Sequence, residues 1–206
     1  MSLVKKIQEL QKGEIKRIVD QRIKEFEQIK NKESNEIFGE LCFCILTANS
    51  TAENCIRVQK EAGEFFLTLE ENKLAEKLKQ VGCRFHTKRA GYICESRKLK
   101  EELILNLKKL EEKELRNWIA DNVKGLGMKE SSHFLRNIGF KNLAIIDFHI
   151  LDILEREKLL TKPTKLDKKT YLEIEKTLEN LAKDLKLTLA ELDLYLWYLE
   201  TGKILK

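Results

Sequence analysis

The stretch LRNWIADNVKGLGMKESSHFLRNIGF, residues Leu115–Phe140, has the pattern of two helices joined by a tight turn. Apolar residues recur at helical spacing on both sides of KGLG, residues 124–127, and glycine tolerates the positive φ angles that such a turn can require. The N–H groups that begin the second helix attract phosphate, together with the helix dipole. The stretch therefore predicts a helical hairpin at 113–138, whose turn fits a nucleic-acid backbone or an ordinary connection between helices.

The glycines and the lysine of the turn point to contact with a charged ligand. Without side chains, Gly125 and Gly127 would let a nucleic-acid backbone approach closely. Lys129 lies in the first turn of the second predicted helix, where its positive charge opposes the helix dipole. That position favours the neutral amine, which is the form that attacks as a nucleophile. The turn therefore predicts an amine beside a bound phosphate.

Asp147 closes the apolar run LAII and stands eighteen residues after Lys129. Because the helical pattern FHILDIL follows it, Asp147 is predicted to be a partly buried N-cap. A carboxylate in such a position can also stabilise a developing positive charge or help to move protons. From the residues alone, capping and catalysis both remain open.

The composition favours an all-α protein. One proline and nine glycines in 206 residues, against many leucines, lysines, glutamates and isoleucines, indicate long helices with few breaks. The predicted helices are 3–31 (as one helix or two), 37–48, 52–66, 73–80, 88–107, 112–123, 148–158, 169–185 and 188–200. The helix 37–48, IFGELCFCILTA, is almost wholly apolar and is predicted to form the buried centre.

Charge and cysteine content restrict the class of protein only loosely. The chain has 39 basic and 34 acidic side chains, a surplus of +5 that suits a polyanionic partner and also many ordinary helical proteins. Its five cysteines lack paired spacing, so buried thiols in a reducing cytoplasm are the favoured interpretation and a metal site the rarer one. The N-terminus is too charged for a signal peptide, and no apolar run reaches the roughly 20 residues that cross a bilayer. We expect a cytoplasmic protein with no membrane partner.

The pattern NVKGLGMKESSHFLRNIG…AIIDFHIL resembles the helix-hairpin-helix DNA glycosylases, in which a lysine follows the hairpin and an aspartate lies about this far downstream. ELCFCILTANSTAE, RFHTKRAGYI and ELDLYLWYLETGKILK narrow the resemblance to the archaeal-type, second class of 8-oxoguanine DNA glycosylase/AP lyases. The resemblance covers essentially the whole chain. It implies two helical lobes with the hairpin at the cleft between them, one lobe formed by 1–33 plus 130–206 and the other by 34–129 including the hairpin at 113–138.

The resemblance also implies a reaction. Lys129 would attack C1′ of the damaged nucleotide and expel the oxidised base, and β-elimination from the resulting Schiff base would cut the strand. Asp147 would stabilise the oxocarbenium-like transition state and help to place Lys129. His149 matches a family position that contacts a phosphate near the lesion, although a histidine near a helix start can equally be structural.

Further residues of the chain match family positions that hold the lesion. Phe85 and Trp197 would flank the flipped purine, although each also fits an apolar core. The family uses the carboxylate of its C-terminal lysine, here Lys206, to accept the N7–H that distinguishes 8-oxoguanine from guanine. Asn49 would fill the gap left by the flipped base or simply end a helix, and Arg84 would face the estranged cytosine.

The remaining expectations concern phosphates, cofactors and partners. Lys88, Arg89 and Lys124 are predicted to contact phosphates irrespective of sequence. No cysteine follows Cys94, whereas endonuclease III-like relatives use four C-terminal cysteines for an iron–sulfur cluster, so we expect no cluster, no bound metal and no required cofactor. A structural monovalent cation on the hairpin carbonyls stays open.

The implied partner is double-stranded DNA containing 8-oxoguanine, bound by a monomer that associates with the nucleoid through DNA. Two rival functions remain open from the sequence. One is a glycosylase/lyase for another oxidised base, and the other is a non-catalytic module that only grips DNA.

Overall fold

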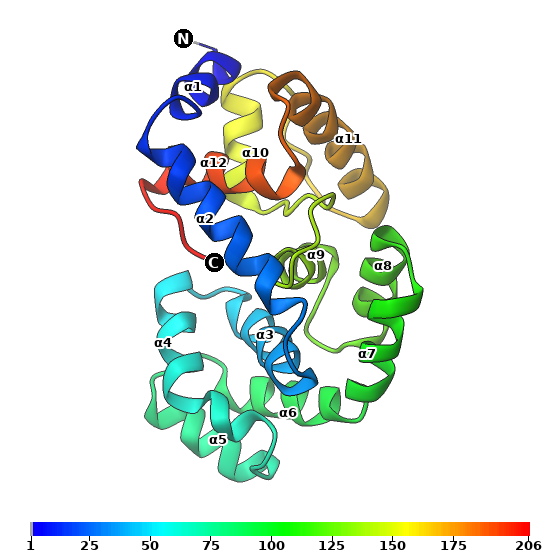
Figure 1. Ribbon diagram of the computed structural model, residues 1–206. Helices are drawn as coiled ribbons and strands as arrows, with labels where there is room; N and C mark the ends of the chain where they lie inside the picture. The colour runs from blue at the N-terminus through cyan, green and yellow to red at the C-terminus, as the bar shows by residue number, and fades with distance from the viewer. Residues whose placement is uncertain (1) are drawn as a thin grey trace.

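The computed structural model describes residues 2–206, and every regular element in that range is a helix, which confirms the all-α prediction (Figure 1). The elements in chain order are α1 (Leu3–Leu10), α2 (Glu14–Ile29), α3 (Ser34–Thr47), α4 (Ala52–Ala62), the short 3₁₀ helix η1 (Gly63–Phe66), α5 (Glu71–Gln80), α6 (His86–Arg97), α7 (Lys100–Lys109), α8 (Glu112–Asn122), α9 (Met128–Asn137), α10 (Phe148–Arg156), α11 (Lys168–Leu185) and α12 (Leu189–Thr201). None of these helices is both long and apolar enough to span a membrane.

Two predicted helices end earlier than their periodicity suggests. The predicted helix 88–107 is two helices, α6 and α7, because the N–H groups of Lys98 and Leu99 donate to carbonyls three residues back, at 3.1 and 3.0 Å. These shorter-range bonds tighten the end of α6, and Leu99 then packs on the apolar core. The predicted helix 52–66 is α-helical as far as Ala62 and continues as η1.

Two apolar clusters divide the helices into a lower half and an upper half, as they appear in Figure 1. The core of the lower half is drawn from residues between Ile37 and Leu143, and that of the upper half from residues 3–26 and 144–196. The N-terminal and C-terminal helices therefore share the upper half. The buried apolar side chains of α9, Phe134 and Leu135, belong to the lower core, so the clusters divide after Leu143, whereas the predicted lobes divide after residue 129.

Helix α3 lies at the centre of the lower half, in agreement with the prediction from its apolar sequence. It contacts α4, α6, α7 and α9, and its residues from Leu41 to Thr47 are all buried. Cys42 and Cys44 are free thiols in this helix, and burial raises the pKa of both. They therefore pack as small apolar side chains.

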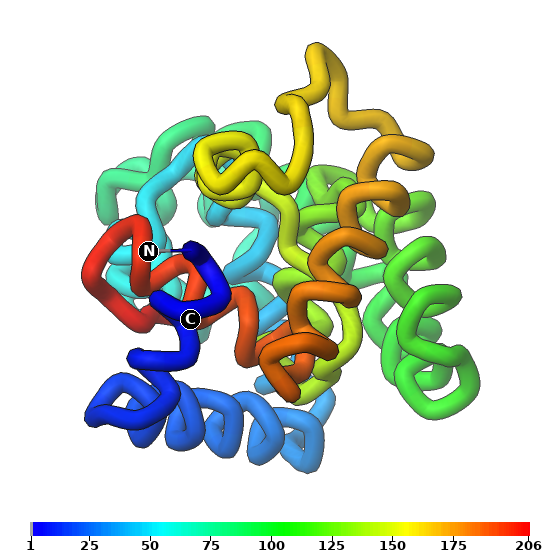
Figure 2. The backbone as a smooth tube through the Cα atoms, turned by 90° about the horizontal axis from the view of Figure 1, so that it is seen from above, coloured from blue at the N-terminus to red at the C-terminus, as the bar shows by residue number. Residues whose placement is uncertain are grey.

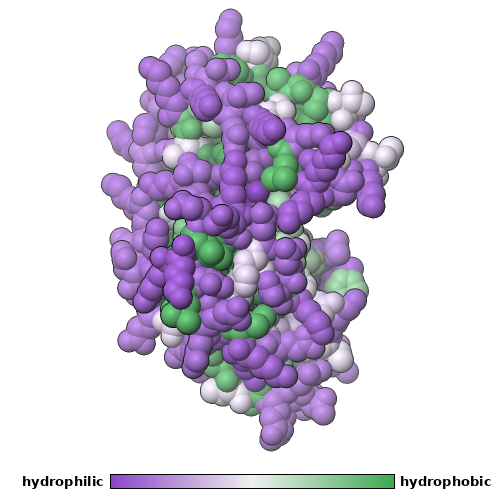
Figure 3. Space-filling model, turned by 90° about the vertical axis from the view of Figure 1, so that its right-hand side faces the viewer, coloured by the Kyte–Doolittle hydropathy of each residue, from purple (hydrophilic) through white to green (hydrophobic). Residues whose placement is uncertain are grey.

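Helix α9 lies at the junction of the halves, where it contacts α3 and α8 in the lower half and α2 in the upper half. Figures 1 and 2 both place α11 of the upper half beside α8. Two of the ion pairs that cross the junction are buried, Arg116 with Glu175 and Arg136 with Asp193, and none of these four side chains is more than 11% exposed. Figure 3 shows an indentation of the surface at mid-height, between the two halves. The buried pairs fix the relative placement of the halves on either side of it.

Candidate active site and nucleic-acid interface

The hairpin predicted at 113–138 is formed by α8 and α9, which pack against each other. Gly125 has a φ of +88°, and a Cβ atom there would overlap the ring of Tyr92. Gly127 instead has an ordinary φ of −96°, and a Cβ atom there would meet only Glu130 Oε2, at 3.5 Å. The turn therefore requires glycine at 125 for backbone conformation, whereas glycine at 127 leaves open space at the start of α9.

Lys129 is the second residue of α9 and its side chain is 23% exposed. Its Nζ lies 3.7 Å from Glu130 Oε1, and the other carboxylate oxygen of Glu130 accepts a hydrogen bond from Gly127 N at 3.3 Å. One carboxylate thus steadies both the turn and the lysine. The Lys129 side chain stays partly exposed at the junction.

Asp147 is the N-cap of α10, as its sequence context predicts. Its Oδ1 accepts a hydrogen bond from Ile150 N at 3.0 Å, and the side chain is partly buried. The residues before it, from Leu143 to Ile146, are buried and carry the chain from the end of the hairpin to α10. The cap holds the carboxylate in a defined position at the start of the helix.

The buried carboxyl group of Asp193, on α12, is within electrostatic range of both Lys129 and Asp147. Burial raises the pKa of the Asp193 carboxyl; its ion-pair partner Arg136 opposes this, Asp147 raises the pKa further and Lys129 lowers it. The charges of Lys129 and Asp147 therefore both influence the pKa of this one carboxyl group. Asp193 was not predicted as a site residue, although it is the one carboxylate in the apolar stretch LDLYLWYL, which could have indicated it.

Aromatic rings gather at the start of α10. The His149 ring lies 4.0 Å from that of Phe148 and meets the Trp197 ring edge-on at 5.3 Å. Phe148 is 61% exposed, the highest value among the large apolar side chains of residues 2–206. Phe148 was not predicted as a site residue, although its position directly after Asp147 could have indicated it. The structure thus joins two predicted site residues, His149 and Trp197, to an exposed ring beside Asp147.

Three other predicted residues meet in the lower half. Arg84 Nη1 donates to Asn49 O at 3.3 Å, and the Arg84 guanidinium carbon lies 5.2 Å from the centre of the Phe85 ring. Asn49 and Phe85 have positive φ values of 55° and 53°, a conformation that is uncommon outside glycine and clusters at functional sites. Phe85 is 54% exposed. An exposed aromatic ring beside a guanidinium suits contact with a nucleobase, whereas its pairing with Trp197 around one purine stays a prediction.

One predicted phosphate contact is wrong. Arg89 is only 4% exposed, and its guanidinium donates to the Ala48 carbonyl and to Cys83 Sγ, the latter at 3.4 Å. Arg89 therefore holds the loop that contains Ala48 and Asn49 from its buried side. Lys124 is exposed and paired with Glu95 at 3.0 Å, so its role at a phosphate stays a prediction.

Lys206 lies against α3 and α4 rather than in the upper half. Its Nζ is 2.7 Å from Glu40 Oε1 and 2.6 Å from Gln59 Oε1, and it lies 4.3 Å from the centre of the Phe43 ring. These contacts anchor the tail that follows α12 at the junction of the halves (Figure 1). Recognition of a base by Lys206 stays a prediction.

The described cysteines and carboxylates do not form a metal site. Within residues 2–206, no three His, Cys, Asp or Glu side chains are grouped so that they could hold a metal ion. All five cysteines are free, and four of them are buried in the lower half. Cation binding at the hairpin carbonyls stays a prediction.

An all-helical chain with a tight glycine hairpin, a lysine at the start of its second helix and an aspartate that caps the next helix defines a helix-hairpin-helix protein. A model of the 8-oxoguanine DNA glycosylase family matches residues 19–187. The chain belongs to the 8-oxoguanine DNA glycosylase family, which confirms the resemblance noted in its sequence.

Relatives of known name and structure support the assignment over the whole chain. The 8-oxoguanine DNA glycosylase/AP lyase of Methanocaldococcus jannaschii is 51% identical over 209 residues, covering 100% of both chains. That of Korarchaeum cryptofilum is 47% identical and covers 99% of this chain and 98% of the relative. The crystal structure of the Methanocaldococcus jannaschii enzyme in complex with a 15mer DNA containing 8-oxoguanine superposes with a TM-score of 0.97, at 51% identity and 100% coverage of both chains.

Proposed function

We propose that this protein excises 8-oxoguanine from double-stranded DNA and then cleaves the strand by β-elimination through a Schiff base on Lys129. The observation that carries the proposal is the partly exposed Lys129 at the hairpin of a chain 51% identical to an 8-oxoguanine DNA glycosylase/AP lyase. The relative bound to DNA containing 8-oxoguanine supports the choice of substrate.

The proposed chemistry starts when the damaged nucleotide leaves the base stack, at a cost of a few kcal/mol. The neutral amine of Lys129 forms a bond to C1′ while the bond from C1′ to the base breaks. Opening of the sugar ring gives the iminium, loss of a proton from C2′ follows, and the 3′ phosphate departs. Asp147 stabilises the positive charge that develops on the sugar. These steps need no cofactor.

Recognition of the lesion is assigned to the rings and to the tail. Phe85 and Trp197 offer exposed or partly exposed aromatic faces for stacking on the flipped base. An acceptor on the Lys206 main chain would bind the N7–H of 8-oxoguanine and disfavour guanine, whose N7 is itself an acceptor. Asn49, Arg84 and His149 are proposed to contact the DNA around the lesion.

Borohydride trapping tests the proposal directly. The protein is incubated with duplexes that differ only in one nucleotide, 8-oxoguanine, guanine or an oxidised pyrimidine, and any Schiff base is reduced to a stable adduct. We expect an adduct and a cut strand with the 8-oxoguanine duplex. Equal or stronger trapping on the oxidised pyrimidine would assign a different substrate, and no adduct on any duplex would exclude the Schiff-base mechanism.

The open space at Gly127 leads to a prediction about DNA affinity. Because residue 127 has an ordinary φ of −96° and a Cβ atom would meet nothing closer than 3.5 Å, Gly127→Ala should fold with almost unchanged stability. An added methyl group would nevertheless keep a phosphate from the start of α9, so we expect the Kd for lesion DNA to rise about tenfold, which corresponds to about 1.4 kcal/mol. Thermal unfolding and fluorescence anisotropy measure the two quantities. An unchanged Kd would show that the hairpin is not part of the DNA interface.

A further inference from the structure

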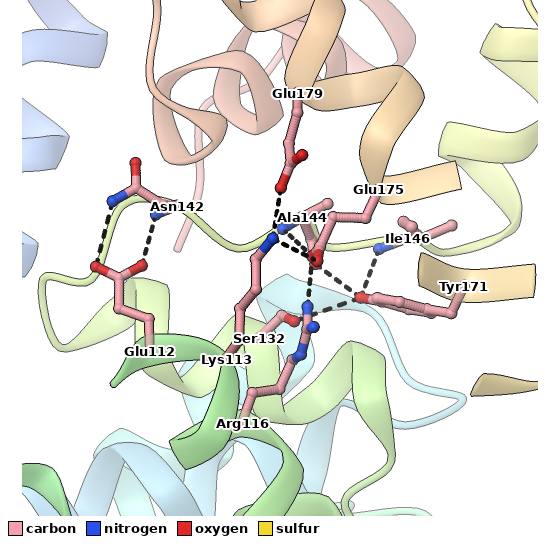
Figure 4. Close-up of polar contacts among 10 residues, drawn as sticks. All are labelled: Glu112, Lys113, Arg116, Ser132, Asn142, Ala144, Ile146, Tyr171, Glu175 and Glu179. Atoms are coloured by element: carbon pink, nitrogen blue, oxygen red, sulfur yellow. Dashed lines mark hydrogen bonds and ion pairs between the residues drawn. The ribbon is translucent and has the colours of Figure 1, made fainter. Parts of the chain in front are cut away.

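The hydroxyl of Tyr171 is bonded to both chain segments that carry the proposed reacting groups. Tyr171 lies on α11 and is 2% exposed. Figure 4 shows its hydroxyl beside the segment that leads to α10: it donates to Ala144 O at 2.7 Å and accepts from Ile146 N at 3.3 Å. The hydroxyl oxygen of Ser132, on α9, lies 3.4 Å away on another side.

These contacts use the whole hydrogen-bonding capacity of the phenol. A tyrosine hydroxyl has one hydrogen to donate and can accept two hydrogen bonds. The hydrogen is used at Ala144 O, so the contact with Ser132 is one in which the serine hydroxyl donates. Burial raises the pKa of Tyr171, which keeps the phenol protonated and able to donate at neutral pH. The three contacts therefore constrain one another.

The partners of Tyr171 are close in the chain to Lys129 and Asp147. Ser132 is three residues after Lys129 on α9, and residues three apart lie on the same side of a helix. Ile146 directly precedes Asp147, the N-cap of α10. One buried hydroxyl therefore links the helix of the amine to the segment that ends in the carboxylate.

Neighbouring charged groups hold the ring of Tyr171 in place. Glu175, one turn further along α11, accepts a hydrogen bond from Ala144 N at 3.0 Å and pairs with Arg116. The Arg116 guanidinium carbon lies 5.7 Å from the centre of the Tyr171 ring. Figure 4 shows α11 presenting both Tyr171 and Glu175 to the same segment of backbone. The backbone of Ala144 is therefore hydrogen-bonded to two side chains of α11.

We propose that Tyr171 is a positioning residue that sets the placement of Asp147 relative to Lys129 during base excision. This inference rests on the proposed function, because it concerns the groups assigned to that reaction. Tyr171 does not contact the substrate; it acts through Ser132 and through the backbone of Ala144 and Ile146. A misplacement of about 1 Å between reacting groups can cost about 100-fold in rate, so a small shift of this segment is sufficient for a measurable effect.

Tyr171→Phe removes the hydroxyl and keeps the buried ring. We expect the single-turnover rate of 8-oxoguanine excision to fall by about 10- to 100-fold, with the Kd for the lesion duplex unchanged. The matched control is Tyr195→Phe, which removes a hydroxyl from another ring of the upper core that is 1% exposed. This control should excise at the wild-type rate. If Tyr171 had only a structural role, Tyr171→Phe would lower stability, and its excision rate and DNA affinity would change together.

Ser132→Ala is a second variant that leaves Tyr171 in place and keeps the test available if Tyr171→Phe fails to fold. Ser132→Ala should slow excision several-fold. The double variant should excise at nearly the same rate as Tyr171→Phe, because both changes remove the same link. Wild-type excision rates in both single variants would overturn the inference, as would equal slowing by Tyr195→Phe. Loss of DNA affinity with an unchanged excision rate would also overturn it.

The two proposals fail in different ways. If the wild-type protein forms no borohydride adduct with 8-oxoguanine DNA, the proposed function fails. If the adduct forms at the wild-type rate in Tyr171→Phe and in Ser132→Ala, the function stands and only the positioning role of Tyr171 is lost.

Discussion

Lys129→Gln is expected to abolish the borohydride adduct and to lower strand cleavage at 8-oxoguanine by at least about 10³-fold, because loss of an attacking nucleophile removes the covalent route entirely. An amide cannot form a Schiff base. The affinity for lesion DNA should remain close to that of the wild type. Trapping gels and anisotropy on the same duplex measure the two effects.

The position of Lys129 explains why this variant should fold. The side chain is 23% exposed, and its ion pair with Glu130 has a length of 3.7 Å, so little stability depends on it. Glutamine is also compatible with a helix. The control is Lys12→Gln, which changes a lysine that is 70% exposed between α1 and α2 and should keep both the adduct and the DNA affinity. An adduct of normal intensity in Lys129→Gln would assign the attack to another amine.

Glu175→Gln is expected to lower the free energy of unfolding by about 3–5 kcal/mol, because it leaves the buried guanidinium of Arg116 without its charged partner. The two side chains are 1% and 0% exposed, so water cannot replace the lost carboxylate. For a chain of this size, the midpoint of thermal unfolding should fall by roughly 6–20 °C. Calorimetry or denaturant unfolding measures the change.

Glu179→Gln is the matched control for this second prediction. Glu179 lies one turn further along α11 and pairs with Lys113 at 2.8 Å, but its side chain is 31% exposed. Loss of such a surface pair should cost no more than about 1 kcal/mol. Equal losses of stability in Glu175→Gln and Glu179→Gln would show that burial of the Arg116 pair does not set its contribution.

Much of the local structure could be predicted because its causes act over a few residues. The hairpin follows from two glycines between apolar stripes, and the N-cap role of Asp147 from a short polar side chain before a helical pattern. The division of 88–107 could not be predicted in this way. Neither glycine nor proline marks the break at Lys98, which depends on how Leu99 packs against the lower core.

In the candidate site, too, only the features that depend on neighbouring residues could be predicted. Lys129 and Asp147 are marked by their local context, and the resemblance of the whole chain suggests a role for each. Arg89 has the sequence context of a surface cation, yet it is buried because the Ala48 carbonyl, 41 residues away in the chain, accepts its hydrogen bond. The sequence context of Asp193 and Phe148 shows at most an unusual position, and their place at the site is given by their neighbours in space.

By itself, the sequence determined the helical class, the glycine turn, the lysine at its end and the family, because periodicity, capping and backbone freedom are properties of neighbouring residues. Only the tertiary structure decided which distant groups meet. Tyr171 is 42 residues from Lys129 in the chain, and it reaches both Ser132 and the approach to Asp147 because side chains of α11 contact α8 and α9 across the junction. A buried hydroxyl must find its partners within the core, and packing of the two halves supplies them.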